Sequence, residues 1–250
     1  MKKEELIRIR YFENEVKNKR AFLRNEFIAK SKNISDGEIK KISIGDLQLL
    51  FNLYDKYFFK NYFKENFRGK ITFSLSKRMT RSAGKTIVPR INASLEEDKQ
   101  KYEIRIGINF FFQYYELDRE KLVAGAKTED PLHALFMVFE HELIHFIEFY
   151  VFGDSSCKNK RFKETAMSTF SHKDVSHSLP TNREIIDKSL GIKIGDKVEF
   201  SYEGKIKNGI INRINKRATV MVLDKGGNYI DKYGNKYSKY YVPLKGLNKI

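Results

Sequence analysis

One segment, from Pro131 to Gly153, limits what this chain can fold into more than any other. It is the most apolar stretch of the sequence, opened by a proline and closed by a glycine, as is common for helices. The same stretch holds six ionisable side chains: His133, Glu140, His141, Glu142, His145 and Glu148. A membrane-spanning helix does not tolerate that load, and a buried helix tolerates it only when the groups are paired or bind a metal. We therefore predict a buried helix that carries a functional site.

The centre of this predicted helix reads His141-Glu142-Leu143-Ile144-His145. Two histidines four residues apart project from one helical face and can bind one Zn²⁺ together. Glu142 follows the first histidine and would lie beside the metal, where it can act as general base and then as general acid. The pattern predicts a zinc-dependent hydrolase, with Glu142 as the catalytic residue and His141 and His145 as metal ligands. A pair of hydrogen-bonded core histidines is the structural alternative.

A catalytic zinc site needs a third protein ligand and leaves the fourth position for water. The downstream sequence offers four candidates: Cys157, Glu164, His172 and His177. Cys157 follows the glycine turn that ends the helix, so the chain can bring its thiol back to the metal. Glu164 would lie on the next helix, predicted over residues 160–170, and the two histidines could be ligands, partners of ligands or helix caps. The residues alone leave this choice open.

Five stretches of the chain resemble the SprT-like zinc metallopeptidases, the Spartan-related family. They are residues 50–59 (LFNLYDKYFF), 76–85 (SKRMTRSAGK), 140–145 (EHELIH), 161–163 (RFK) and 170–179 (FSHKDVSHSL). The resemblance covers roughly residues 45–180, and its most specific part is the His-Glu-x-x-His core. It implies a compact zincin-like domain, hydrolysis of peptide bonds, and a link to DNA and to proteins crosslinked to DNA.

The resemblance also bears on the third metal ligand. The family supplies a histidine followed by glycine, shortly before the aromatic residue that Phe162 matches. Here residues 155–162 contain no histidine, and Cys157 lies within one residue of the expected place. The resemblance thus implies His141, His145 and Cys157 as zinc ligands. The same departure from the family pattern leaves an alternative: a DNA-associated adaptor protein without catalytic activity, with a structural zinc site or none.

The order of the predicted elements indicates an α+β protein. Residues 1–45 are expected to form a helical extension. Residues 46–182 would form the zincin-like domain, with helices and a small antiparallel sheet. Residues 190–250, where glycines separate short alternating segments, would form a small SH3-like β-barrel.

Within the zincin-like part, helical spacing predicts one helix over residues 44–67. Alternating patterns predict strands at residues 71–75, 87–93 and 102–108. Three such strands account for the small sheet expected beside the metal-binding helix.

A formal net charge of +16 suggests an anionic partner, and DNA is the first candidate. Two regions carry much of the surplus: a basic loop at residues 77–85, and the segment from Ile192 onward, with thirteen Lys and Arg against five Asp and Glu. In the barrel, Arg213, Lys216 and Arg217 are expected to be exposed, and tyrosines could stack on bases. Protein docking or structural support by the barrel is the alternative, as is the use of lysine as a default surface residue.

Cysteine content and the N-terminal sequence predict a cytoplasmic protein. A single cysteine, Cys157, excludes an internal disulfide, which fits a reducing compartment. The first residues are charged and lack the apolar run of a signal peptide. We expect a protein or peptide substrate, DNA as a partner and no membrane.

Overall fold

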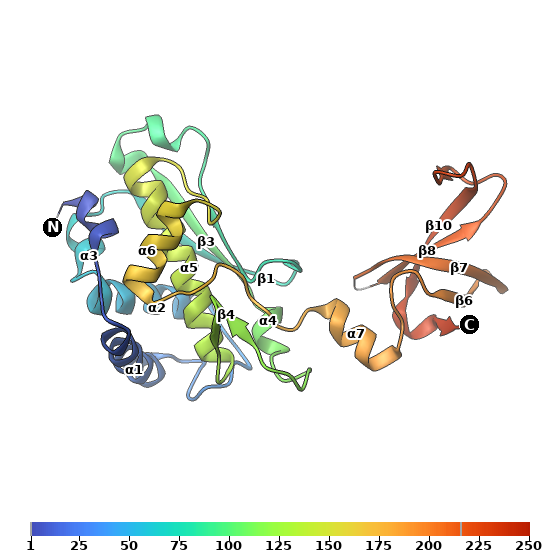
Figure 1. The fold of residues 1–250 in the computed structure, drawn as a ribbon, viewed down its shortest axis with the longest axis horizontal. Helices are drawn as coiled ribbons and strands as arrows, with labels where there is room; N and C mark the ends of the chain where they lie inside the picture. Colours follow the sequence, from blue (N-terminus) through green and yellow to red (C-terminus); the bar gives the residue numbers. More distant parts are fainter. Residues whose placement is uncertain (1, 216) are drawn as a thin grey trace. The chain divides into compact units, whose positions relative to one another are not determined.

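The computed structural model describes residues 2–215 and 217–250, so the expected exposure of Lys216 lies outside the described residues. The chain divides into two compact units, Met1–Pro180 and Thr181–Ile250 (Figure 1). Residues 1–45 contribute Leu6, Val16 and Leu23 to the core of the first unit, so they do not form a separate extension. Each unit is described by itself below.

Helices and one small mixed sheet make up most of the first unit. In chain order its elements are η1 (Lys3–Arg8), α1 (Glu13–Lys30), α2 (Ile44–Phe58), α3 (Tyr62–Asn66), β1 (Lys70–Ser76), β2 (Gly84–Ile87), η2 (Asn92–Ser94), η3 (Glu97–Lys99), β3 (Lys101–Gly107), α4 (Asn109–Phe112), β4 (Leu122–Val123), β5 (Ala126–Lys127), α5 (Pro131–Phe152) and α6 (Lys160–Phe170), where η marks a 3₁₀ helix. The helices predicted around the motif and after it correspond to α5 and α6.

A break after α2 replaces the single helix that was predicted over residues 44–67. Lys60 and Asn61 adopt left-handed backbone angles, with φ of 55° and 59°, between α2 and α3. The buried Asp55 carboxylate accepts hydrogen bonds from the backbone N–H groups of Phe63 (2.9 Å) and Lys64 (2.8 Å). It thereby satisfies the start of α3, whose first N–H groups have no partner within the helix.

The sheet of the first unit is mixed, not antiparallel as expected. Its strand order is β1-β3-β2, with β1 parallel and β2 antiparallel to β3. β2 begins at Gly84, earlier than the strand predicted at residues 87–93. Pro89 has no N–H to donate to a ladder, and the chain enters the 3₁₀ helix η2 soon after it. The earlier start matters because β2 is an edge strand that lies against α5.

Helix α5 forms the centre of the first unit and packs against the sheet and against α6 (Figure 1). The Asp130 carboxylate caps its start by accepting a hydrogen bond from the His133 backbone N–H at 2.7 Å. Arg24 of α1 pairs with the same carboxylate at 2.7 Å. Gly153 ends the helix with a φ of 78°. In the part of the chain that the structure describes, no helix is both long and apolar enough to cross a membrane.

A buried carboxylate, that of Glu140, joins α5 to three other segments. Arg20 of α1 donates two hydrogen bonds to it, at 2.7 and 2.6 Å. The hydroxyl of Tyr54 on α2 and Nε2 of His172 each lie 2.8 Å from it. Burial would raise the pKa of Glu140, but the charge of Arg20 and the hydrogen bonds from His172 and Arg20 outweigh it and lower the pKa to about 2. The carboxylate is therefore charged and fully paired inside the core.

The second unit consists of one helix and a six-stranded sheet. Its elements are α7 (Asn182–Leu190), β6 (Lys197–Tyr202), β7 (Lys205–Ile214), β8 (Arg217–Leu223), β9 (Tyr229–Ile230), β10 (Lys236–Pro243), η4 (Leu244–Gly246) and β11 (Asn248–Lys249). Neighbouring strands in the order β11-β6-β7-β8-β10-β9 are antiparallel. Arg213 and Arg217 are exposed, as predicted.

The sheet of the second unit is open, so the expected closed SH3-like barrel is not found. Among the described residues of this unit, no ladder joins β9 to β11. These edge strands span two residues each, which leaves little backbone for the ladder that barrel closure requires. One face of the sheet is filled by Val198, Phe200, Val220 and Val242, which form the core of this unit.

Replacing Arg20 with alanine should strongly destabilise the first unit. The change leaves the buried Glu140 carboxylate without its cation, and breaking one partner of a buried pair costs about 3–5 kcal/mol. Urea denaturation of the full chain measures the free energy of unfolding. Lys30→Ala is the control, because this exposed lysine pairs with Glu26 in a surface interaction of about 0–1 kcal/mol. Equal losses in both variants would contradict the role assigned to Glu140.

Candidate metal centre

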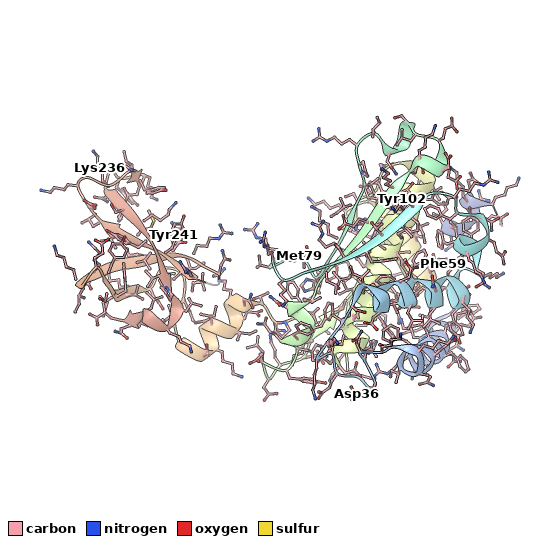
Figure 2. The ribbon with its side chains drawn as sticks, turned by 180° about the vertical axis from the view of Figure 1, so that it is seen from behind. Asp36, Phe59, Met79, Tyr102, Lys236 and Tyr241 are labelled. Carbon is pink, nitrogen blue, oxygen red and sulfur yellow. The ribbon has the colours of Figure 1, made fainter. Side chains whose placement is uncertain are left out.

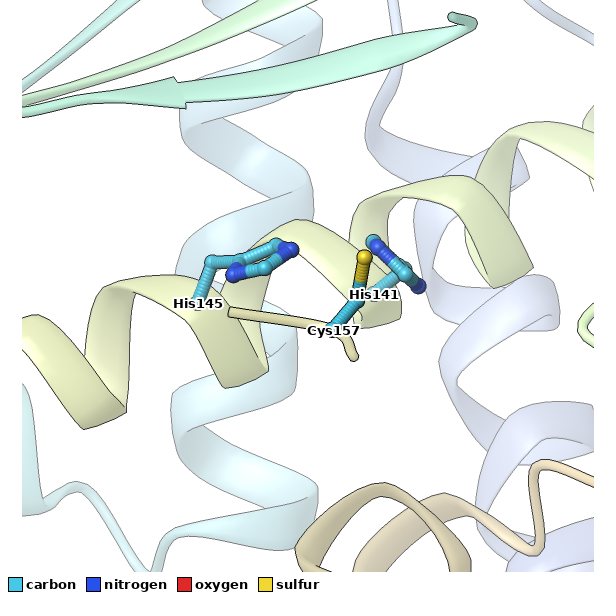
Figure 3. A group of neighbouring side chains, drawn as sticks. All are labelled: His141, His145 and Cys157. Carbon is cyan, nitrogen blue, oxygen red and sulfur yellow. The ribbon is translucent and has the colours of Figure 1, made fainter. Parts of the chain in front are cut away.

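Three potential metal ligands converge beside α5. His141 and His145 lie one turn apart on the same side of the helix, and Cys157 lies on the connection between α5 and α6 (Figure 3). One donor atom from each side chain lies within 4.8 Å of the other two. The left-handed φ of Gly153 turns the chain back and lets Cys157 approach the histidines. Among the described residues, no other group of three or more His, Cys, Asp or Glu side chains is gathered in this way.

The other candidates for the third ligand lie elsewhere. Glu164 is exposed on α6 and pairs with a lysine of its own helix at 3.5 Å. His172 is buried and contacts Glu140 at 2.8 Å. His177 lines the same cleft as the metal ligands, but its Nε2 lies 3.2 Å from the backbone nitrogen of Ala83. The structure therefore places only the cysteine with the two helix histidines.

The donor set of two imidazoles and one thiol suits zinc. Zinc binds nitrogen at about 2.0–2.1 Å and thiolate sulfur at about 2.3 Å, and catalytic sites combine three protein ligands with an open position. The three donor atoms lie within 4.8 Å of one another, close enough to be candidate ligands of one ion. Mg²⁺ and Ca²⁺ prefer oxygen ligands and match these donors poorly. His141, His145 and Cys157 are therefore the residues that would hold the metal.

A chain of hydrogen bonds fixes the orientation of the His145 ring. The Ser155 hydroxyl donates to the Glu148 carboxylate at 2.6 Å, so its oxygen is left to accept from His145 Nδ1 at 2.7 Å. The Glu148 side chain is completely buried and is held by Arg161 at 2.8 Å. With its proton on Nδ1, His145 keeps the lone pair of Nε2 free for a metal, an arrangement typical of zinc-binding histidines.

Burial keeps both histidines in the neutral form that binds metals. The pKa of His141 falls to about 3, first because burial disfavours the charged ring and second because His145 is close. Burial lowers the pKa of His145 to about 4. The Phe162 ring covers both imidazoles, with its centroid 4.9 Å from that of His141 and 4.3 Å from that of His145. At neutral pH neither ring has to lose a proton before a metal binds.

The Glu142 carboxylate lies against the edge strand β2. The Thr86 hydroxyl donates to it at 2.8 Å, and a Cβ added at Gly84 would come within 2.6 Å of its Oε1. Glycine at this position therefore leaves the space that the carboxylate occupies. Burial raises the pKa of Glu142 to about 7, although the hydrogen bonds from Thr86 act in the opposite direction. A carboxyl group with such a pKa can both accept and return a proton near neutral pH.

The three candidate ligands and Glu142 share one cleft of about 480 Å³. One side of the cleft is lined by residues 81–86, which lie on β2 and just before it. The rest is lined by α5, by residues 155 and 157, by residues 175–177, and by two residues of β4 and its turn. Glu142 is the only carboxylate among these lining residues, whereas Arg81 and Lys85 are exposed in the cleft wall. The basic loop predicted at residues 77–85 thus reaches the candidate site.

Four residues that shape the site were not singled out from the sequence: Gly84, Thr86, Glu148 and Ser155. Glu148 lies three residues after His145 and so faces the same side of α5, which was a usable signal. Ser155 lies in an irregular turn, where spacing gives no direction. Gly84 and Thr86 meet Glu142 across more than fifty residues of sequence, and this contact depends on how β2 docks on α5.

Ser155→Ala should weaken zinc binding about 10- to 100-fold, because the His145 ring loses the partner that orients it. Competition with a chelating dye measures the zinc affinity. Ser156→Ala is the matched control, since its hydroxyl meets only the Lys158 backbone N–H, at 3.4 Å. Ser155→Thr keeps the hydroxyl and should retain most of the affinity. If Ser155→Ala binds zinc as tightly as the control, the hydrogen-bonded chain does not support the site.

The raised pKa of Glu142 predicts pH-dependent stability of the metal-free protein. The folded protein holds this proton to about pH 7, against an ordinary pKa of 4.5, so stability falls as the pH rises between these values. Glu142→Gln stays neutral and should equal the wild type near pH 4 but exceed it by roughly 3 kcal/mol at pH 8. Urea denaturation with a chelator present measures the gap at each pH. A gap that does not grow with pH would contradict the burial of this charge.

Similarity to known proteins assigns no family to this geometry. No protein-family model, no curated protein and no solved structure matches the chain. What the site can do therefore follows from the chemistry of its own side chains, chiefly His141, Glu142, His145 and Cys157.

Proposed function

We propose that the first unit is a zinc-dependent peptidase. The observation that carries this proposal is the convergence of His141, His145 and Cys157 in the cleft that also holds the Glu142 carboxylate. Three protein ligands, here two imidazoles and one thiolate, and one buried general base are the parts that metal-assisted hydrolysis requires. The resemblance of residues 45–180 to the SprT-like metallopeptidases points to the same chemistry.

Glu142 would carry the proton transfers of the reaction. A bound zinc ion would supply Lewis acidity and lower the pKa of water. Glu142, held by Thr86, would take a proton from the attacking water and later return it to the leaving amine. Its pKa of about 7 in the metal-free protein suits both directions of transfer.

The edge strand β2 supports a peptide as the substrate. β2 has a partner strand on one side only, so an extended peptide could pair with its other edge. Residues 81–86 line the cleft, so a peptide bound in this way would run past Glu142 and the metal ligands. A small, enclosed apolar pocket would suit a small molecule. A cleft beside a free strand edge suits an extended peptide chain.

We place proteins bound or crosslinked to DNA among the substrates, as the SprT-like resemblance implies. Lys77, Arg78, Arg81 and Lys85 are all exposed in the loop that leads into β2. Exposed Lys and Arg side chains attract phosphates, and this attraction weakens with salt. DNA held by this loop would bring attached proteins close to the cleft.

A DNA-associated adaptor without catalytic activity is the competing function. It is favoured by one observation: the candidate for the third ligand is Cys157, where the resembled family has a histidine. A structural zinc site with an inert Glu142 would have the same ligands. Turnover therefore decides between the two.

Glu142→Gln should lower the rate of protein cleavage by at least about 100-fold while zinc content stays near one equivalent, because only the proton carrier is lost. Cys157→Ala should lose zinc and activity together, since two histidines remain as ligands. Glu164→Ala, on the exposed side of α6, is the matched control and should retain both. Elemental mass spectrometry and a cleavage assay on an unfolded protein substrate give the two readouts. No cleavage by the zinc-loaded wild type would favour the adaptor, whereas unchanged cleavage by Glu142→Gln would contradict the role proposed for Glu142.

The same assay includes one substrate protein in two forms, free and crosslinked to DNA. Faster cleavage of the crosslinked form, with an advantage that shrinks as salt rises, is the result expected for DNA-linked substrates. Equal rates for both forms would remove DNA from the proposed function and leave the peptidase in place.

A further inference from the structure

The second unit exposes one face of its sheet, and this face has no role in the proposed peptidase. Antiparallel pairing places directly opposed residues on the same side of a sheet, and residues two apart on a strand share a side. Among the side chains that the ladders place opposite the core are eight that are, except for one lysine, apolar or aromatic. We call this set the outer face: Ile206, Ile210, Met221, Leu223, Tyr229, Tyr237, Lys239 and Tyr241.

Three tyrosines run along one end of the outer face. Tyr229 on β9 is paired with Tyr237 on β10. Tyr241, which is labelled in Figure 2, lies four residues further along β10. Tyr229 is 44% exposed and Tyr241 is 64% exposed. The Lys239 ammonium lies 3.8 Å from the centroid of the Tyr229 ring, which brings a cation and an aromatic ring together on this face.

The outer face is hollowed beside these tyrosines. A depression of about 580 Å³ is lined chiefly by Ile194, Ile210, Met221, Tyr229, Ile230 and Tyr237. Ile230 is 66% exposed and adds apolar surface to this depression. A flat ring, such as a nucleobase, would bury this apolar surface without needing hydrogen bonds to a particular edge.

The charge of the second unit identifies the kind of partner. Residues 181–250 contain fifteen Lys and Arg against seven Asp and Glu, a surplus of eight positive charges. Lys197 lies opposite Ile210 in its ladder, and Arg213 lies opposite Thr219, so both lie on the same side of the sheet as the outer face, as does Glu199. Among the described residues, neither Lys197, Arg213 nor Lys239 forms an ion pair, which leaves three cations for an anionic ligand.

We infer that the outer face binds single-stranded nucleic acid. Exposed tyrosines stack on unpaired bases, and Lys and Arg beside them contact the phosphates. A duplex hides the faces of its bases in its own stack and could use only the charges. An acidic peptide would satisfy the cations but would gain little from the tyrosines. The inference concerns the second unit alone and does not depend on peptidase activity.

The experiment is a fluorescence anisotropy titration of the full-length protein with labelled oligonucleotides. One sequence is used as single-stranded DNA, single-stranded RNA and duplex DNA, at several salt concentrations. We expect at least one single strand to bind tighter than the duplex, with an affinity that falls as salt rises. The two single strands together show whether the sugar matters.

Tyr229→Ala and Tyr241→Ala should each weaken single-strand binding roughly tenfold, and Tyr241→Phe, which keeps the ring, should not. Tyr202→Ala is the matched control. Tyr202 is also 44% exposed, but it lies on the opposite side of the sheet, against Tyr240. Thermal unfolding of each variant shows that the fold is retained.

Three results would overturn the inference: duplex binding as tight as single-strand binding, an equal loss in Tyr202→Ala, or displacement of the oligonucleotide by an acidic peptide at similar concentration. Glu142→Gln serves as a further control and should bind single strands like the wild type. A protein that binds single strands but cleaves nothing would refute the peptidase only, and one that cleaves peptides but binds no single strand would refute this inference only.

Discussion

The buried carboxylate of Glu140 links four segments of the first unit. A charge in an apolar core is stable only when its hydrogen-bonding capacity is filled, and Glu140 achieves this with groups from α1, α2 and the segment after α6. The requirement works in both directions, because Arg20 is also largely buried and needs an anion. The network has a free-energy cost at His172, because its Nδ1 is buried without a hydrogen-bond partner. Glu140 directly precedes His141, so α1, which holds Glu140 through Arg20, supports the part of α5 that carries the candidate site.

Helix α5 shows how one residue type takes three roles through its surroundings. Glu140 faces a guanidinium and stays charged. Glu142 faces apolar surface and one hydroxyl, so its pKa rises towards neutrality. Glu148 contacts Ser155 and Arg161, and the Ser155 hydroxyl that it holds orients the His145 ring. Within nine residues, Glu140 thus stabilises the fold, Glu142 is the candidate proton carrier and Glu148 orients a candidate ligand. Their roles differ because different groups pack against each carboxylate.

Local sequence patterns predicted the parts of the structure that depend on local forces. The ends of α5 and α6 follow from a proline, a glycine and helical periodicity. The choice of Cys157 among four candidate ligands did not follow from spacing and came from the SprT-like resemblance. The errors arose where tertiary contacts decide. The helix predicted over residues 44–67 is divided because the Asp55 carboxylate caps the start of α3. Strand β2 begins at Gly84, where the backbone packs against the Glu142 side chain. The sequence of the second unit alternates between apolar and polar residues, as that of a β-barrel does. This alternation does not show whether the edge strands are long enough to close a barrel.

The Arg20–Glu140 pair has a consequence for how the chain is made. Its partners are 120 residues apart, and Arg20 also binds the Phe170 carbonyl, 150 residues away. At ribosomal rates of about 5–20 residues per second, roughly 6–24 seconds separate the synthesis of the arginine from that of its carboxylate. During this time α1 has neither its ion pair nor the apolar surface of α5. Helix α1 is therefore secured only after α5 and Phe170 have been synthesised, and the first unit completes its fold only as the second begins to emerge.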